Sequence, residues 1–351
     1  MAGIKDLKKS MGKRPEGKRL ERITASSNYT EGKFQNVQQT EVSPKDVSTL
    51  AVIKEMLTRP KSVRPSAELP NIKTDLNTIS SDKPVMVWFG HSSYFIDLNG
   101  FRILVDPVFS GNASPVSFFG KSFPGADKYE IEDFPEIDLL IQTHDHYDHL
   151  DYPSILKLKS KVKKVVTSLG VGAHLEYWGI EPEKITELNW WENHWVNPNL
   201  KLTAAPARHF SGRGLSRFKT LWSSFILEFK EYRFFLGGDS GYSNQFKEIG
   251  EKFGPFDLAF LECGQYNEKW PQIHIFPEQV ITAAQELKAE MVWPVHWGKF
   301  TLSVHPWNEP IKRFTVAAEK AGLPYISPKI GEPYTLGENF RQEDWWNFGN
   351  K

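Results

Sequence analysis

Three histidines and three aspartates lie within the nine residues THDHYDHLD, at positions 143–151. Imidazole nitrogens and carboxylate oxygens are common ligands of Zn²⁺. The candidate ligands in this stretch are His144, His146, Asp148 and His149. His144 and His146 are two positions apart, so their side chains face the same way in an extended loop. Asp148 and His149 are adjacent and converge only where the chain turns, which suggests a second metal ion beside the first.

One loop cannot complete two metal sites, because each zinc ion takes about four ligands. Three further candidates stand in distant parts of the chain: His209 in APARHFSGRG, Asp239 in FFLGGDSGY and His296 in MVWPVHWGKF. Each follows an apolar stretch with the pattern of a strand, as THDHYDHLD follows IDLLIQ. This repeated order, a strand and then a ligand, predicts one shared site.

The elements that must position these residues can be predicted from periodicity and turn signals. The expected strands are 85–89, 93–98, 101–105, 137–142, 163–168, 200–206, 222–229, 232–237, 257–262 and 291–296. The expected helices are 152–159, 171–178, 243–252, 277–289 and 308–321. Asn99-Gly100 is a two-residue hairpin signal, and Asp151 is the expected N-cap of a helix with Pro153 in its first turn. Hairpins mixed with strand–helix units predict two packed sheets with helices outside.

Residues 1–82 differ from the rest of the chain and are predicted to form a polar, partly ordered extension laid on a main domain of residues 83–351. One short helix is expected within 45–58, before a region broken by several prolines. The basic start of the extension can contact phospholipid headgroups, although a solvated tail is the simpler interpretation.

Composition excludes several classes of protein. The 351 residues carry 43 basic and 43 acidic side chains, so no overall charge favours nucleic acid. The single cysteine, Cys263, excludes an internal disulfide and a cysteine-built zinc site. No signal peptide and no run of about 20 apolar residues is recognisable, so the predicted location is the cytoplasm. The 12 tryptophans are interpreted chiefly as core residues.

The pattern H-x-H-x-D-H, followed by a distant His, an Asp after a strand and a final His, resembles the metallo-β-lactamase superfamily over about residues 83–335. Within it the chain looks most like the N-acylphosphatidylethanolamine-hydrolysing phospholipase D family and its bacterial relatives. The stretches that carry this likeness are GHSSYFI, LVDPVFSGNASP, THDHYDHLDY, NWWEN, GDSGY, KFGPFDLA and HWGKF. The resemblance implies an α+β fold, a four-layer αββα sandwich, and two Zn²⁺ ions per chain.

The same resemblance implies a division of the ligands between the two ions. The first would be bound by His144, His146 and His209, the second by Asp148, His149 and His296, with Asp239 bridging both. Imidazole at position 146 favours zinc, whereas a carboxylate there would favour the di-iron relatives. The implied enzyme is a metal-dependent hydrolase, a phosphodiesterase whose nucleophile is a metal-bridging hydroxide.

Three alternatives stay open at this point. A lactonase or other small-molecule hydrolase, resembling ascorbate-6-phosphate lactonase, would use the same metals. A nuclease is disfavoured by the zero net charge. A non-catalytic, metal-stabilised binding protein is disfavoured because all seven expected ligands are present. The predicted partners are a small molecule or a phospholipid, with peripheral membrane contact and no nucleic acid; no oligomeric state is predicted.

Other residues are assigned by the resemblance. Asp148 and His274 are the predicted catalytic residues, His274 as a proton donor or charge stabiliser near the phosphate. The stretch from Tyr266 to His274 departs from the animal enzymes, which leaves a surface loop as the alternative for His274. Asp106 is expected to support the metal loop by hydrogen bonding, with a simple Asp-Pro turn as the alternative. His91 is expected near the mouth of the site.

Several polar residues near these motifs receive no firm role. Asp145 lies between ligands and is expected to face away from the metals or to orient the loop. Three arginines flank His209 and are equally suited to phosphate binding or to a solvated loop: Arg208, Arg213 and Arg217. Three histidines match no ligand position: His174, His194 and His305.

Overall fold

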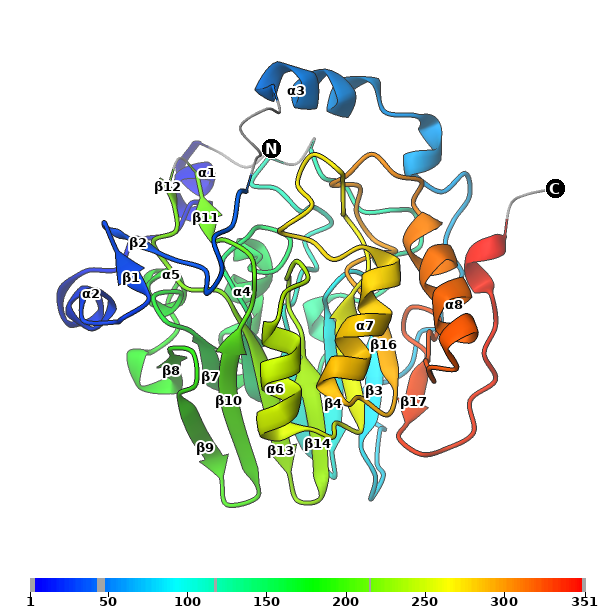
Figure 1. Ribbon diagram of the computed structural model, residues 1–351. Coiled ribbons are helices and arrows are strands. Elements are labelled where there is room, and N and C mark those ends of the chain that lie inside the picture. Colours follow the sequence, from blue (N-terminus) through cyan, green and yellow to red (C-terminus); the bar gives the residue numbers. More distant parts are fainter. Residues whose placement is uncertain (1–3, 43–47, 117–118, 215, 349–351) are drawn as a thin grey trace.

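The computed structural model describes residues 4–42, 48–116, 119–214 and 216–348 (Figure 1). Its larger sheet has seven strands in the spatial order β17-β3-β4-β5-β6-β7-β8. These strands are β17 (Pro333–Thr335), β3 (Val85–Trp88), β4 (Tyr94–Leu98), β5 (Phe101–Val105), β6 (Ile137–Gln142), β7 (Val162–Ser168) and β8 (Ile185–Leu188). The β17-β3-β4-β5 part is antiparallel, and the β5-β6-β7-β8 part is parallel.

The second sheet has six strands in the order β16-β15-β14-β13-β10-β9. They are β9 (Asn193–Asn197), β10 (Leu200–Pro206), β13 (Ser223–Phe229), β14 (Tyr232–Leu236), β15 (Leu258–Glu262) and β16 (Val292–Val295). The β14-β15-β16 part is parallel, and the remaining pairs are antiparallel. Two small hairpins add β1 (Tyr29–Thr30) with β2 (Lys33–Phe34), and β11 (Gly212–Arg213) with β12 (Ser216–Arg217).

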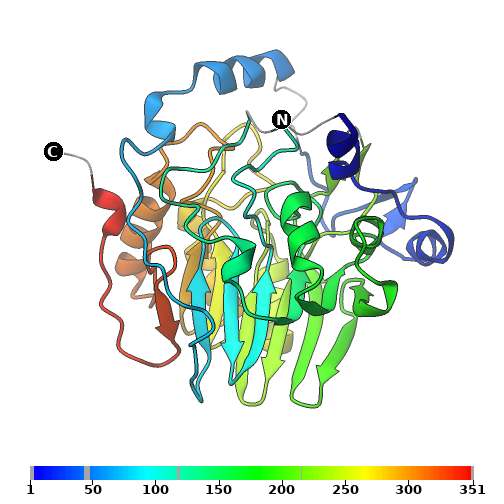
Figure 2. The same ribbon diagram turned by 180° about the vertical axis from the view of Figure 1, so that it is seen from behind.

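Helices cover the outer face of each sheet. In Figure 1 the six-stranded sheet is covered by α6 (Gln245–Phe253), α7 (Pro277–Leu287) and α8 (Glu309–Ala321). Figure 2 shows α4 (Tyr152–Leu158) and α5 (Gly172–Tyr177) on the outer face of the seven-stranded sheet. The described chain also has four short 3-10 turns: Lys61–Val63, Ile131–Asp133, Pro182–Lys184 and Trp345–Asn347. The predicted α+β class and the four-layer αββα sandwich are confirmed.

The alternation of apolar side chains explains why the two sheets pack face to face. Tyr94 of β4 stacks on Phe260 of β15 across the interface, with ring centroids 4.2 Å apart. A separate apolar cluster on the other side of the large sheet includes Leu140 of β6 and Ile155 of α4, both fully buried. Burial of each such side chain stabilises the folded state by about 1.5–3 kcal/mol relative to leaving it in water. Both faces of the seven-stranded sheet therefore contribute to the stability of the fold.

Local signals are confirmed where the turn chemistry is explicit. Asn99 and Gly100 both have positive φ, at 54° and 84°, as a two-residue hairpin turn between β4 and β5 requires. Pro153 lies in the first turn of α4, with Asp151 at the N-cap position. However, the Asp151 side chain makes no hydrogen bond to the helix backbone. In the two large sheets, β8, β9 and β17 were absent from the expected elements, and so were the strands of the two small hairpins, β1, β2, β11 and β12.

The N-terminal extension contains more regular structure than its composition predicts. It forms α1 (Ile4–Ser10), α2 (Gly17–Thr24) and α3 (Thr49–Thr58), of which α3 lies over the loop-bearing end of the molecule (Figure 1). The helix expected within 45–58 corresponds to α3, and residues 45–47 lie outside the described residues. Ile23 and Phe34 are buried against Trp222 of the main domain. The division at residue 82 stays a prediction.

Candidate metal centre

The loops that carry the predicted ligands meet at one end of the sandwich. One follows β6 of the seven-stranded sheet, and the others follow β10, β14 and β16 of the six-stranded sheet. These last three strands run in the same direction, because β10 and β14 are both antiparallel to β13 and β14 is parallel to β15 and β16. Their carboxyl ends therefore lie at one edge, which is why the order of strand and then ligand brings distant residues together.

A first cluster is formed by three imidazoles. His144 Nε2 lies 3.0 Å from His146 Nδ1, and His209 Nε2 lies 3.1 Å from the same His146 nitrogen. Four ligands at about 2.0–2.1 Å from one zinc ion would be about 3.3 Å apart, so these nitrogens are spaced nearly as a single ion requires. Asp239 Oδ2 lies 3.5 Å from His209 Nε2 and 3.8 Å from His144 Nε2.

A second cluster lies beside the first. Asp148 Oδ2 is 3.6 Å from His149 Nε2 and 3.4 Å from His296 Nε2. Asp239 Oδ1 is 3.1 Å from the same His149 nitrogen and 3.2 Å from that of His296. The two oxygens of Asp239 thus face different clusters, Oδ2 the first and Oδ1 the second. All seven predicted ligands are brought together.

The donor set fits metal ions. Among the described residues, His149 Nε2 and Asp239 Oδ1 are buried with no hydrogen-bond partner, although they face each other. A buried polar atom without a partner is costly, and an ion between these two atoms would satisfy both. Nitrogen and carboxylate oxygen are donors that Zn²⁺ accepts, and the described clusters contain no cysteine ligand.

The electrostatics of the centre also favour cations. Burial lowers the pKa of His144, His146 and His209, which keeps these imidazoles in the neutral form that binds metals. Burial acts in the same direction on His149 and His296, but the surrounding carboxylates together outweigh it, and Asp239 makes the largest contribution among them. The pKa of His149 lies well above its ordinary value, and that of His296 is about 10. The buried carboxylates therefore require positive charge around them.

Asp106 holds the metal loop from behind. Its Oδ1 accepts hydrogen bonds from Thr143 N at 2.8 Å and from Gln142 Nε2 at 2.9 Å. Its Oδ2 accepts one from the Thr143 hydroxyl at 2.6 Å and lies 2.8 Å from His149 Nδ1. The contact with Nδ1 leaves Nε2 of His149 to face the second cluster. Asp106 has a positive φ of 41°, a backbone conformation that is uncommon for residues other than glycine. The hydrogen bonds to its side chain stabilise the turn in this conformation.

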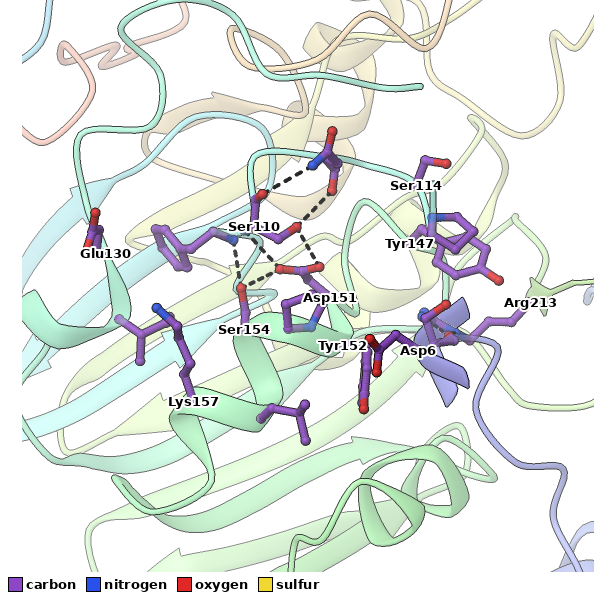
Figure 3. Close-up of a pocket in the computed structure, with 17 residues that line it drawn as sticks. Asp6, Ser110, Ser114, Glu130, Tyr147, Asp151, Tyr152, Ser154, Lys157 and Arg213 are labelled. Carbon is purple, nitrogen blue, oxygen red and sulfur yellow. Dashed lines mark hydrogen bonds between the residues drawn. The ribbon is translucent and has the colours of Figure 1, made fainter. Parts of the chain in front are cut away.

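Asp151, at the end of the same loop, makes a second support (Figure 3). Its carboxylate accepts hydrogen bonds from Ser110 N at 3.1 Å and Ser110 Oγ at 2.9 Å, and from Ser154 Oγ. These bonds join the loop after β5 to the first turn of α4. They border a cavity of about 600 Å³ that is lined by Tyr147, but by none of the seven predicted ligands.

The structure places His91 deeper than the resemblance implies. Its side chain is fully buried, and His91 Nε2 lies 2.9 Å from Asp148 Oδ2. Burial lowers the pKa of His91 to about 3, so the ring is neutral. His91 therefore lies within the second cluster, where it contacts the same Asp148 oxygen that faces His149 and His296, instead of standing at the mouth of the site.

Sequence reasoning missed Glu262, the last residue of β15. Its Oε2 lies 2.7 Å from His274 Nδ1 and 3.0 Å from His296 Nδ1, and its Oε1 accepts a hydrogen bond from Ser240 N at 2.6 Å. Glu262 thus ties His274 to the metal centre. The available signal was its position: an acidic residue at the end of a strand, as with the predicted ligands.

A cavity of about 280 Å³ opens onto the clusters. His146, Asp148, His209, Asp239, His274 and His296 line its floor and walls, so His274 reaches the same space as the predicted ligands. The other lining residues are Val42, Phe210, Arg217, Gln265, Trp270, Ile273 and Leu302. Most of this second group is apolar, with Arg217 as its cation.

The remaining candidates have structural contacts. Arg213 is buried and donates to the carbonyls of Ser10, Asp145 and Leu150. Arg208 donates to Thr40 Oγ1 and to the carbonyls of Gln39 and Tyr242, so only Arg217 of the three arginines lines the cavity.

The three unassigned histidines lie outside the clusters. His174 in α5 contacts Asp145 Oδ2 at 3.3 Å, and Asp145 also accepts hydrogen bonds from Gly212 N and Thr220 Oγ1. This turns Asp145 away from the predicted ligands. His305 stacks on Tyr266, and His194 lies in β9.

The fold and the histidine–aspartate clusters together define a metal-dependent hydrolase. A family model described as a beta-lactamase superfamily domain matches residues 101–297, and the chain belongs to that superfamily.

Comparisons with individual proteins agree with this family. An uncharacterised protein of Mycobacterium tuberculosis is 36% identical over 92% of this chain and 87% of its own length. The N-acyl-phosphatidylethanolamine-hydrolyzing phospholipase D 1 of Caenorhabditis elegans is 34% identical over 61% of this chain and 64% of its own length. The structure of Igni18, a metallo hydrolase from the archaeon Ignicoccus hospitalis, aligns with a TM-score of 0.57 at 22% identity, over 73% of this chain and all of that one. At that identity the last comparison supports the fold alone.

Proposed function

We propose that the chain is a binuclear zinc phosphodiesterase that acts on an N-acylated phospholipid. The observation that carries the binuclear assignment is the split carboxylate of Asp239, with Oδ2 toward His209 and His144 and Oδ1 toward His149 and His296. In this proposal His144, His146 and His209 hold one ion, Asp148, His149 and His296 hold the other, and Asp239 bridges them.

The chemistry that two zinc ions supply when bound is activation of a water molecule and stabilisation of negative charge on a phosphate. The residues of the chain fix the geometry for it. Glu262 is positioned to accept a hydrogen bond from His274 Nδ1 at 2.7 Å, which leaves Nε2 of His274 for the substrate. In our proposal His274 acts in its doubly protonated form: Nδ1–H donates to the Glu262 carboxylate, which balances the positive charge, and Nε2–H gives its proton to the departing alcohol oxygen. The leaving group then departs as a neutral alcohol, and the ring becomes neutral.

The lining of the cavity supports a substrate with both an anionic and an apolar part. Arg217 offers a positive charge at the cavity, and a guanidinium pairs well with phosphate oxygens. Val42, Trp270 and Leu302 offer apolar surface beside it. The similarity to the Caenorhabditis elegans phospholipase supports the same class of substrate. A phosphorylated lactone would favour several arginines, whereas Arg208 and Arg213 are engaged elsewhere.

We further propose that the chain reaches its substrate from the cytoplasm by peripheral contact with a lipid surface. Across the described ranges, no helix combines the length and the apolar character that a membrane crossing requires. Within the polar extension, residues 1–82, the described residue Val42 lines the metal cavity. We propose no nucleic-acid partner.

The test combines metal analysis with a choice of substrates. Wild-type protein loaded with zinc should hold two ions and cleave vesicles that contain N-acylphosphatidylethanolamine, whereas Asp239→Asn should lose one ion and fall to background turnover. The fold should persist, because Asp239 contributes to the centre and not to the apolar core. Asp138→Asn is the matched control, since its partly buried carboxylate pairs with Lys163, accepts a hydrogen bond from Arg102 N and belongs to neither cluster. Cleavage of phosphorylated lactones without cleavage of the lipid would overturn the substrate; undiminished turnover of Asp239→Asn would overturn the binuclear assignment.

A further inference from the structure

A stretch of the N-terminal extension lies against the metal centre. Within it, Asn36 contacts His209, a predicted ligand. The side chain of Asn36 makes two hydrogen bonds to the backbone of His209. Asn36 Nδ2 donates to His209 O at 2.7 Å, and His209 N donates to Asn36 Oδ1 at 3.0 Å. Such a paired contact fixes the backbone of one residue in both position and orientation. Trp222 Nε1 also donates to Asn36 Oδ1, at 3.2 Å, and so holds the amide in place.

The residues after Asn36 continue the contact; we call residues 36–42 the strap. Arg208, next to His209, donates to Thr40 Oγ1 at 3.0 Å and to Gln39 O at 3.2 Å. At the far end, Glu41 N donates to Gln272 Oε1 at 2.8 Å. The strap therefore joins the loop of His209 to the segment that contains Gln272.

That second segment also acts on His209. Ile273 O lies 2.8 Å from His209 Nδ1 and accepts a hydrogen bond from it, which leaves Nε2 to face His146. His209 is thus held on its backbone by Asn36 and on its ring by Ile273, and the strap is bonded to both loops. Val42, at the end of the strap, lines the metal cavity.

We propose that Asn36 is a positioning residue of the metal centre and that the strap is a wall of the substrate cavity. The inference rests on the proposed function, because it assigns Asn36 to the ion held by His144, His146 and His209. Among the described hydrogen bonds, Asn36 makes none to Asp148, His149 or His296, the residues proposed to hold the second ion. The two ions should therefore respond differently to loss of the Asn36 side chain.

The test measures metal binding in the full-length protein without any substrate. Residues that support a ligand typically change metal affinity or activity by about 10–100-fold when they are replaced. In Asn36→Ala we expect one of the two zinc ions to bind about 10–100-fold more weakly in competition with a chelator, and the other to bind as in the wild type. With Co²⁺ in place of zinc, the visible absorption of one site should change, which a purely structural role would not cause.

Gln35→Ala is the matched control, because Gln35 is exposed and, among the described hydrogen bonds, its side-chain amide donates only to Thr30 O and Lys33 O. It should bind both ions normally. Asn36→Asp is the second variant in case the alanine protein does not fold. It keeps the acceptor for His209 N but places an oxygen against His209 O, so it should also weaken one ion.

The outcomes separate this inference from the proposed function. If the wild type binds two ions and both Asn36 variants bind them equally well, with unchanged cobalt absorption, the inference fails and the binuclear centre stands. If the wild type binds no more than one ion, the proposed function and the inference both fail. Weakening of both ions together would also overturn the assignment of Asn36 to His209.

Discussion

Four of the five predicted imidazole ligands are contacted on the nitrogen that faces away from the centre. His149 is backed by Asp106, His296 by Glu262, His209 by Ile273 O and His144 by the Thr143 hydroxyl. At His144, His149 and His209 the contact is a hydrogen bond, which selects the nitrogen that carries the proton and presents the other nitrogen to a metal ion. At His296 the contact is an ion pair with Glu262 at 3.0 Å. The chemistry of the centre therefore depends on acceptors that are not themselves predicted ligands.

Glu262 offers the clearest test with a single residue, because its one carboxylate contacts the imidazole rings of both His274 and His296. In Glu262→Gln, one oxygen becomes an NH₂ group, which cannot accept a hydrogen bond. Either the contact with Ser240 N or the contacts with His274 and His296 must then be lost. We expect zinc affinity or turnover to fall by about 10–100-fold, with the fold retained. The measurement is chelator competition, followed by steady-state kinetics on the metal-loaded protein.

Glu286→Gln is the control for this change. Glu286 accepts a hydrogen bond from Tyr242 and is not among the residues that line the metal cavity. It should leave zinc affinity unaltered. Equal affinity of Glu262→Gln and the wild type, with equal turnover, would show that Glu262 does not orient either ring.

At the scale of elements, the ligand loops are predictable and the strap is not. The sequence shows His209, Asp239 and His296 after apolar strands. Because β10, β14 and β16 run in the same direction, these three residues are brought to one edge of the sheet. Asn36 lies in a polar stretch with no periodicity, so only the folded chain reveals its bonds to His209. Glu262 was overlooked because a single acidic residue at a strand end is common at protein surfaces.

Similar physical reasons explain why sequence analysis missed three strands of the two large sheets. β8 and β9 are partly exposed and carry polar residues, so neither shows the apolar run of a buried strand. β17 has only three residues, Pro333–Thr335, and gains its structure from pairing with β3. The expected elements were therefore most accurate where burial is deepest.

Close packing between loops gives the prediction at this scale. A Cβ atom at Gly241 would lie 1.9 Å from Gln272 O, and Gly241 N donates to Arg208 O at 2.9 Å. Gly241→Ala must therefore push the loop of Asp239 away from the segment that holds His209. We expect a loss of stability of about 1–3 kcal/mol together with weaker zinc binding. Denaturant unfolding of the apo protein and chelator competition measure the two effects.

Gly250→Ala provides a matched control with a clash of the same depth. Its Cβ would lie 1.9 Å from Glu286 O, between α6 and α7. This variant should lose comparable stability but bind zinc normally. If both variants weakened zinc to the same extent, the metal effect would follow from global destabilisation, and the argument from loop position would be wrong.

At the scale of the whole molecule, the metal centre joins the two sheets. Its ligands come from the loop after β6 in the seven-stranded sheet and from the loops after β10, β14 and β16 in the six-stranded sheet. The apolar interface holds the sheets along their length, as the Tyr94–Phe260 contact illustrates. Bound ions would add a connection at the end where the loops meet.

This arrangement predicts that zinc stabilises the entire fold. A ligand that binds only the folded state at 100 times its dissociation constant adds about 2.7 kcal/mol to the free energy of unfolding. We therefore expect the midpoint of denaturant unfolding to rise as free zinc increases and to fall when a chelator removes it. Asp239→Asn should show a smaller zinc-dependent gain than the wild type, because it lacks the carboxylate between the clusters. Asp138→Asn should show the full gain. A midpoint that does not respond to zinc or to chelator would mean that the folded centre binds no ion, since binding to the folded state alone must shift the equilibrium.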